Sequence, residues 1–209
     1  MYVHPAFKSD LETSKAFLAE RGFGTLIAQS SGAPIAVHVP FLFQPNERGG
    51  LIELHVARAN SIHELLAVHP QVLIVCTGPD AYVSPDWYGS PNQVPTWNYI
   101  AVHATGRAQL MDKDWLPAHL DRLSAKFEAW LPKKTWSSEA VDPQRLAAMM
   151  NAIVGITIEV DALEGNWKLG QHKGLSDHQG AVAGLRTTMD PASMAVATLM
   201  DRGRGIPSY

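Results

Sequence analysis

The sequence predicts a mainly β fold with peripheral helices (α+β), in which an antiparallel sheet curls into a barrel. Short strand-like runs joined by tight turns dominate the first 80 residues. A long alternating run follows over 97–111, and most of the helix-like segments come after it. Strands first and helices later favour a curled antiparallel sheet with helices on its outside. Periodicity alone does not distinguish this barrel from other small antiparallel barrels.

The size of the chain suits one compact domain. It has 209 residues, of which 46% are apolar and 18% charged, the proportions of a globular protein with a packed core. We therefore expect a single domain over 1–209, with a C-terminal helical extension from about residue 174. No apolar run approaches the roughly 18 residues of a membrane span, and no signal peptide is recognisable, so no membrane partner is expected.

The single cysteine bears on the compartment. Cys76 lies inside the apolar run 72–77, which predicts a buried strand thiol. One cysteine excludes an intramolecular disulfide and fits a reducing cytoplasm. We therefore expect a cytoplasmic protein.

The first part of the chain predicts two helices and four strands. Asp10 is a good N-cap and Gly22 a good C′ residue, which predicts a helix over 11–21. Asn60 is expected to cap a short helix over 61–68. Turn-forming Gly, Pro, Asn and Ser residues separate the other segments. The predicted strands cover 24–29, 35–43, 51–56 and 71–77.

The second part begins with the long strand over 97–111, in which apolar and polar residues alternate. Gly106 inside this strand predicts a bulge or a bend. Asp142, followed by a proline at the first helical position, predicts a helix over 143–151. The remaining predicted elements are helices over 114–130, 175–185 and 191–201 and strands over 153–160 and 166–169.

The segments 78–88 and 94–99 concentrate Trp, Tyr and Pro together with small polar residues. One interpretation is a groove that grips a flat ring and forms hydrogen bonds to its edge. The other is a Pro-rich connection whose aromatic residues close one end of a β core. Composition leaves both interpretations open.

A set of segments spans nearly the whole chain: 1–5, 36–41, 54–60, 78–88, 94–103, 153–156 and 164–171. In this order, they resemble the PaiB-type family of FMN-binding negative transcriptional regulators. In one place the chain departs from the family. The family usually has Lys-Leu-Ser-Gln-Asn where this chain has Lys168-Leu-Gly-Gln-His172, which changes the hydroxyl and the amide available to a ligand there.

The resemblance implies an FMN-binding split β-barrel that forms a homodimer, with FMN at the subunit interface. It also implies a role in transcriptional control. An FMN site needs cationic or N–H donors for the phosphate, flat apolar walls for the ring, and amide or backbone partners for the ring edge. The chain offers candidates for each need.

Arg58, Asn60 and Ser61 are candidates for the phosphate, because they lie between a predicted strand end and a predicted helix start. Backbone N–H groups and a forked guanidinium can converge on an anion at such a place. Without the resemblance, Asn60 as a simple cap and Arg58 as a surface charge would be the preferred interpretation. His55, just before them, could face either the ligand or the core.

Thr96, Trp97, Asn98 and Tyr99 are candidates for the ring. Alternation places Trp97 and Tyr99 on one face of the strand and the other two on the opposite face. One pair should face the flavin, and the sequence does not say which. Packing of Trp97 in a dimer interface is the alternative to ring stacking.

Lys168 and Gln171 are the last candidates, and their ligand roles rest on the resemblance. Lys168 could neutralise the phosphate or approach the N1–O2 region of the flavin, where negative charge grows on reduction. Gln171 could pair with the ring edge. The alternative for Lys168 is a surface lysine whose stem packs on apolar neighbours.

Three functions compete: a flavin-dependent regulator, a flavin oxidoreductase of unknown substrate, and a haem-binding protein. Haem would need a ligand such as His38, His103 or His172, and His38 is expected in the core rather than on a ligand. The histidines do not have metal-site spacing, and we expect no metal.

DNA is a partner implied by the family name, but the sequence supports it weakly. The formal net charge is −3, and no helix-turn-helix pattern or basic stripe is present. The nearest approaches to a basic cluster are Lys133–Lys134 and Arg202 with Arg204, and both are small. We therefore expect the isolated protein not to bind DNA specifically.

Overall fold

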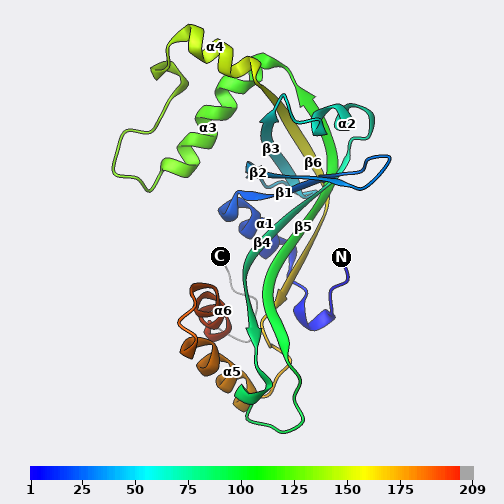
Figure 1. The fold of residues 1–209 in the computed structure, drawn as a ribbon, viewed down its shortest axis with the longest axis vertical. Coiled ribbons are helices and arrows are strands. Elements are labelled where there is room, and N and C mark those ends of the chain that lie inside the picture. Colours follow the sequence, from blue (N-terminus) through cyan, green and yellow to red (C-terminus); the bar gives the residue numbers. More distant parts are fainter. Residues whose placement is uncertain (203–209) are drawn as a thin grey trace. The chain divides into compact units, whose positions relative to one another are not determined.

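The computed structural model describes residues 1–202, and Figure 1 shows their fold. Arg204 and the end of the predicted C-terminal extension lie outside the described residues. Six strands form a closed barrel in the order β1-β2-β3-β6-β5-β4, which confirms the predicted fold class. The strands are β1 (Phe23–Ala28), β2 (Ile35–Gln44), β3 (Gly50–Ala57), β4 (Gln71–Val83), β5 (Thr96–Met111) and β6 (Ile153–Lys168).

Helices occupy the connections and the C-terminal part of the described chain. The α-helices are α1 (Leu11–Arg21), α2 (Ile62–Val68), α3 (Leu116–Glu128), α4 (Pro143–Asn151), α5 (Leu175–Thr187) and α6 (Pro191–Asp201). Short 3-10 helices are η1 (Pro5–Phe7), η2 (Pro85–Trp87), η3 (Lys113–Trp115) and η4 (Ser138–Ala140). Within residues 1–202, none of the helices is both long and apolar enough to cross a membrane.

The chain divides into two compact units. Unit 1 comprises 1–21, 76–103 and the chain from 163 onward, and unit 2 comprises 22–75 and 104–162. The strands β4, β5 and β6 contribute residues to both units. The single domain over 1–209 stays a prediction.

Period-two alternation builds the core of unit 2. In β3, Ile52, Leu54 and Val56 are buried inside the barrel, where the side chains of one strand face meet. Glu53 and His55 therefore lie on the opposite face of the strand. This outer face packs against α3 through the hydrogen bonds described below.

The predicted ends of two helices are confirmed by their capping contacts. Asp10 Oδ1 accepts a hydrogen bond from the Thr13 amide at 2.7 Å at the start of α1, and Asp142 Oδ1 accepts one from the Arg145 amide at 2.9 Å at the start of α4. Gly22 has φ +53°, the left-handed conformation expected after the end of α1.

Two strands are longer than predicted. β4 does not end at residue 77 but continues to Val83, because buried Ala81 and Val83 alternate with exposed Asp80 and Tyr82 beyond the Gly-Pro step. The two strands predicted at 153–160 and 166–169 are one strand, β6. Asp161 and Glu164, between the two predicted strands, are exposed residues of this continuous strand.

The start of α2 differs from the prediction by one residue. Ser61, not Asn60, is the N-cap, and its side chain makes no capping hydrogen bond. Asn60 still stabilises the helix start, because its Oδ1 accepts a hydrogen bond from the Ile62 amide at 3.0 Å. Cys76 is buried, as predicted for a strand thiol.

Gly106 marks a close approach between β5 and β6. A Cβ added there would lie 2.2 Å from the carbonyl oxygen of Glu159, so only glycine fits without a backbone shift. We expect Gly106→Ala to destabilise the protein by about 1–3 kcal/mol, as overpacking does. Urea unfolding monitored by circular dichroism measures this. Gly32→Ala is the control, because nothing lies within 4 Å of its added Cβ, and equal stability of both variants would contradict the prediction.

Candidate functional site

The predicted site residues fall into two groups, one in each unit. Thr96, Trp97, Asn98, Tyr99, Lys168 and Gln171 belong to unit 1, and His55, Arg58, Asn60 and Ser61 belong to unit 2. Each group is described separately.

The two faces of β5 in unit 1 differ in access. Asn98 is only 3% exposed, and its Nδ2 donates a hydrogen bond to Met200 Sδ of α6 at 3.3 Å. Ile100, two residues on, is also buried. Trp97 is 54% exposed and Tyr99 is half-buried. The Asn98 face is therefore closed by α6, and the face of Trp97 and Tyr99 is open.

An amine lies beside this open face. Lys168 Nζ donates a hydrogen bond to Thr96 Oγ1 at 2.6 Å and lies 6.0 Å from the centre of the Tyr99 ring. Partial burial lowers the pKa of the Lys168 amine. Asn166 Nδ2 donates to the Tyr99 hydroxyl at 3.1 Å, which fixes that ring from the next strand.

A second aromatic side chain joins Trp97 on the open face. The Tyr82 and Trp97 rings meet edge to face, with centroids 6.1 Å apart and an interplanar angle of 72°. Tyr82 is 46% exposed. We call the surface formed by Tyr82, Trp97, Tyr99 and Lys168 the ring face. Tyr82 lay in the aromatic segment noted in the sequence but was not singled out, since its segment was not recognised as a strand.

Gln171 has a local role in the turn after β6. Its Oε1 accepts a hydrogen bond from the Leu169 amide at 2.8 Å, and its side-chain amide donates to the Trp167 carbonyl. Gly170 between them has φ +74°, which favours glycine. Both ends of the Gln171 amide are thus engaged within this turn.

Arg58 of unit 2 forms hydrogen bonds with backbone carbonyls where α4 ends and β6 begins. Its Nε donates to the Asn151 carbonyl at 2.8 Å and its Nη2 to the Ile153 carbonyl at 3.0 Å. A guanidinium has five N–H donors, so further donors remain. The phosphate roles of Arg58, Asn60 and Ser61 stay predictions.

His55 of unit 2 belongs to a group of polar side chains between β3 and α3, which we call the polar seam. Glu53 and His55 share the outer face of β3, and His119 and Arg122 lie one turn apart on α3. Arg122 Nη2 donates to Glu53 Oε2 at 2.8 Å, and His55 Nδ1 lies 3.2 Å from His119 Nε2. Gln44 Nε2 also donates to Glu53, at 3.2 Å. Burial lowers the pKa of His55.

His119 is the most buried member of this seam. Its side chain has 0% exposure and stacks on Trp115, with centroids 4.4 Å apart and an interplanar angle of 13°. Its Nδ1 lies 3.8 Å from Glu53 Oε2, and no hydrogen-bond partner of this atom is found in the described part of the chain. Burial, together with His55 and Arg122, lowers the pKa of His119 to about 3. The helix that carries His119 was predicted from the sequence, but the contact between the two histidines was not.

The three histidines considered for haem do not take part in the contact between His55 and His119. His38 was expected in the core, but it is exposed, and its Nδ1 lies 3.0 Å from Thr25 Oγ1 on the neighbouring strand. The expectation was wrong because His38 occupies the outer face of β2. The His172 ring meets Phe7 edge to face at 5.1 Å. His103 is half-buried, and no cluster of His, Cys, Asp and Glu suited to a metal ion is found in residues 1–202.

The comparison with known families matches the fold and the predicted cofactor class. Residues 1–162 match the family described as "Putative FMN-binding domain", and the chain belongs to this family. It is 32% identical over 203 residues to protease synthase and sporulation protein PAI 2 of Bacillus subtilis, covering 96% of this chain and 97% of that protein. An uncharacterized protein of Emericella nidulans is 26% identical, covering 86% of this chain and 83% of its own.

Solved structures support the fold. The flavocytochrome Anf3 from Azotobacter vinelandii is similar with a TM-score of 0.56 and 18% identity, covering 82% of this chain and 72% of that chain. The FAD and haem binding protein from Mycobacterium smegmatis is similar with a TM-score of 0.55 and 16% identity, covering 81% and 76%. These neighbours are flavin-binding split-barrel proteins, and the predicted split-barrel class is confirmed.

We expect acid to destabilise the protein through His119. Its folded-state pKa of about 3 lies below the ordinary value of 6.5, so the unfolded chain binds more protons below pH 6.5. Stability contributed by neutral His119 is therefore present above pH 6.5 and lost progressively as the pH falls toward 3. The loss should be on the order of 2 kcal/mol at pH 5.

Urea unfolding at pH 8 and pH 5 measures this loss. His119→Gln should remove most of the dependence, because glutamine does not titrate. His69→Gln, at an exposed histidine of the same unit, should keep it. If His119→Gln and the unchanged protein lose stability equally on acidification, His119 is not its source.

Proposed function

We propose that this protein binds FMN and acts as a flavin-dependent regulator or sensor in transcriptional control, of the PaiB type. The observation that carries the proposal is the ring face. An open surface with exposed Trp97 offers an apolar wall, and the half-buried Lys168 amine beside Tyr99 offers a cation to the edge of a bound ring. Bound FMN would supply electron-transfer chemistry, which a sensor can use to report redox state.

The donor set of the ring face fits a flavin. Lys168 would stabilise the negative charge that grows near N1 and O2 on reduction. Asn166 Oδ1 is buried and has no hydrogen-bond partner within residues 1–202, so it is an acceptor available for an N–H of the ring. Asn98 would not contact the ring directly but would support β5 from its closed side. Thr96 orients the Lys168 amine.

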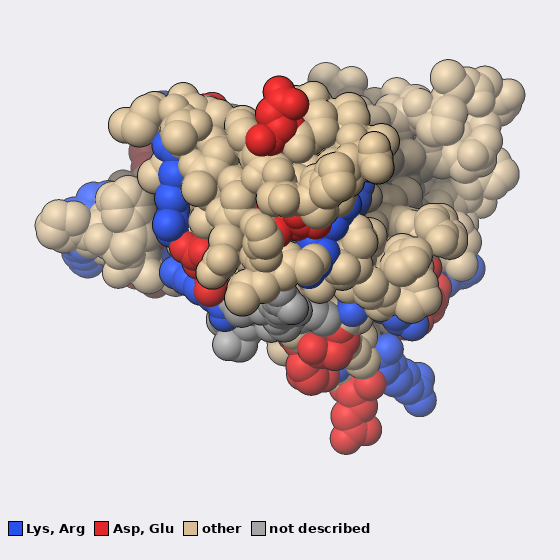
Figure 2. Space-filling view, turned by 90° about the horizontal axis from the view of Figure 1, so that it is seen from below, with Lys and Arg blue, Asp and Glu red and all other residues tan. Residues whose placement is uncertain are grey.

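The regulatory part rests on relatives rather than on a nucleic-acid surface. The resemblance to the PaiB type supports it, and the Bacillus subtilis relative is named for protease synthesis and sporulation. On the face shown in Figure 2, Lys and Arg of the described residues are interspersed with Asp and Glu, and uncharged residues cover wide areas. With a net charge of −3, we favour action through a partner protein over direct DNA binding. The buried single Cys76 supports a cytoplasmic location.

A haem-binding protein is the second candidate, since the names of two structural neighbours include a cytochrome or haem. A flavin oxidoreductase is the third, and the nature of its substrate is open. The absorption spectrum of the purified protein after addition of FMN or haemin separates them. Two bands in the blue and near-ultraviolet that shift on binding support the proposal, and a single intense Soret band from haem contradicts it. Repeated reduction and reoxidation of the bound flavin in the presence of an electron donor and an electron acceptor would favour the oxidoreductase.

The phosphate and ring assignments can be separated with riboflavin, which lacks the phosphate. We expect Arg58→Ala to weaken FMN by about 1.5–3 kcal/mol more than riboflavin, the contribution of a hydrogen bond to a charged group. We expect Lys168→Met to weaken both ligands to a similar extent. Titration by quenching of flavin fluorescence measures the affinities of the unchanged protein and of both variants for the two ligands.

Two control variants accompany these titrations. Arg107→Ala and Lys134→Met remove exposed cations outside the proposed contacts, and neither should change the affinities. Equal losses for FMN and riboflavin in Arg58→Ala would restrict Arg58 to its two carbonyl contacts. Unchanged affinities in Lys168→Met would contradict the ring assignment.

We also propose a homodimer that covers the ring face, because Tyr82 and Trp97 would otherwise leave exposed aromatic surface. Light scattering should give twice the monomer mass at micromolar concentration. Trp97→Asp should shift the mass toward the monomer, whereas Trp130→Asp, at a side chain that is 79% exposed on the C-terminal side of α3, should not. A stable monomer for the unchanged protein would exclude this assembly.

A further inference from the structure

The loop between β4 and β5, residues 84–95, is held by a carboxylate of α5. The Ser90 amide and the Ser90 hydroxyl both donate to the Asp177 carboxylate at 2.8 Å, one to each oxygen. Gln93 Nε2 donates to the same carboxylate at 3.3 Å. Asp177 is only 7% exposed, and the hydrogen bonds from Ser90 lower the pKa of its carboxyl group. A buried, ionised carboxylate with several donors is a strong fixed point for a loop.

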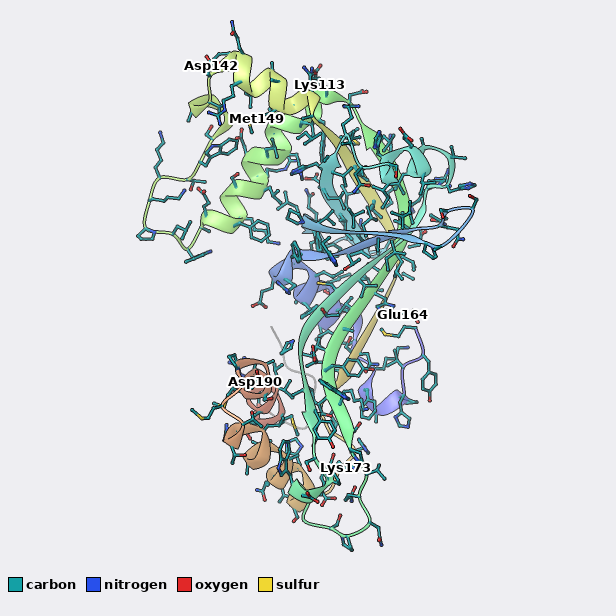
Figure 3. All side chains as sticks on the ribbon, viewed as in Figure 1. Lys113, Asp142, Met149, Glu164, Lys173 and Asp190 are labelled. Atoms are coloured by element: carbon teal, nitrogen blue, oxygen red, sulfur yellow. The ribbon has the colours of Figure 1, made fainter. Side chains whose placement is uncertain are left out.

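A cation holds the same loop from the turn before α5. Lys173 Nζ donates to Gln93 Oε1 at 2.6 Å and lies 4.6 Å from the centre of the Tyr88 ring. Figure 3 shows Lys173 beside the loop. The loop therefore has both a carboxylate and an amine as partners from the C-terminal part of the chain.

Trp87 makes a third contact between the loop and α5, by close packing on the helix. A Cβ added at Gly184 of α5 would lie 2.1 Å from Trp87 Cδ2, and one at Gly180 would lie 1.9 Å from the Trp87 carbonyl oxygen. Only glycine at both positions lets the Trp87 residue lie directly on the helix backbone. The loop is thus seated on α5 as well as hydrogen-bonded to it.

The same helical hairpin supports β5 and the turn after β6. Met200 of α6 accepts the hydrogen bond from Asn98, and its Cε lies 3.5 Å from the position of a Cβ at Gly170. His178 Nε2 lies 3.0 Å from the Met200 carbonyl oxygen and ties α5 to α6. The hairpin therefore contacts the loop, the strand that carries Trp97, and the turn that follows Lys168.

We propose that the α5–α6 hairpin is the positioning element of the ring face and that Asp177 is its chief positioning residue. The loop joins the end of β4, which carries Tyr82, to the start of β5, which carries Trp97. A fixed loop keeps these two aromatic side chains in the conformation that a flat ring requires, so binding does not have to order them. The inference rests on the proposed FMN function and adds to it that the C-terminal helices set the affinity.

The first experiment tests, without ligand, whether Asp177 holds the loop of residues 84–95 in place. Hydrogen exchange of amides 84–95 is compared in the unchanged protein, Asp177→Ala and Glu20→Ala. Glu20 is an exposed carboxylate on α1 in the same unit and forms no hydrogen bond with the loop within residues 1–202, so its removal controls for the loss of one negative charge outside the hairpin. We expect faster exchange of the loop only in Asp177→Ala. Unchanged loop protection in that variant overturns the proposal.

The second experiment tests positioning by FMN titration of the same three proteins. If Asp177→Ala leaves the loop in its binding conformation about a tenth of the time, the apparent Kd rises about tenfold. Most of the change should appear in the dissociation rate. Quenching of the bound flavin's fluorescence should also weaken, because the aromatic side chains are less well placed. Glu20→Ala should keep the affinity and the quenching of the unchanged protein.

The outcomes separate the inference from the proposed function. Loosened loop exchange with unchanged FMN affinity and quenching overturns positioning and leaves FMN binding intact. Failure of the unchanged protein to bind FMN overturns both, whatever the exchange data show. If Asp177→Ala does not fold, Ser90→Ala removes one of the same hydrogen bonds from the exposed end and should give a smaller change in the same direction. Unchanged exchange and affinity in Ser90→Ala would then contradict the proposal that Asp177 positions the loop.

Discussion

The alternation of side chains along the strands is the constraint on which the rest of the structure depends. Because Ile52, Leu54 and Val56 occupy the inside of the barrel, Glu53 and His55 must lie outside, where α3 meets them. In unit 1 the same rule puts Asn98 under α6 and leaves Trp97 on the open side. Glu53 and His55 in unit 2 and Trp97 in unit 1 therefore lie on strand faces opposite to the buried side chains of the same strands.

Local signals were sufficient where a structure is decided within a few residues. The helix between Asp10 and Gly22 and the cap at Asp142 depend on contacts three or four positions away, and the sequence predicted both. The strand alternation also separated Trp97 from Asn98 correctly. Which of the two faces is open depends on Met200, about a hundred residues later, and could not be predicted from the strand itself.

Partners distant in the sequence account for the rest. Arg58 was considered a phosphate ligand or a surface charge, but two of its donors reach carbonyls at the junction of α4 and β6. The helical pattern around His119 did not predict that its side chain is wholly buried against His55. The β4 strand passes through a Gly-Pro step because pairing within the sheet outweighs the local tendency to turn. Family membership covers 1–162, so Lys168 and Gln171 lie beyond the matched residues.

The glycines of α5 have a consequence for how this part of the molecule folds. Two glycines in a helix of this length each cost about 1 kcal/mol relative to alanine, so α5 is a weak helix by itself. Trp87 occupies the space that those glycines leave, and its packing offsets the cost. Helix and loop therefore stabilise each other through this contact. A fragment that ends where the family match ends would retain the aromatic loop but lose the helix surface that gives it a structure.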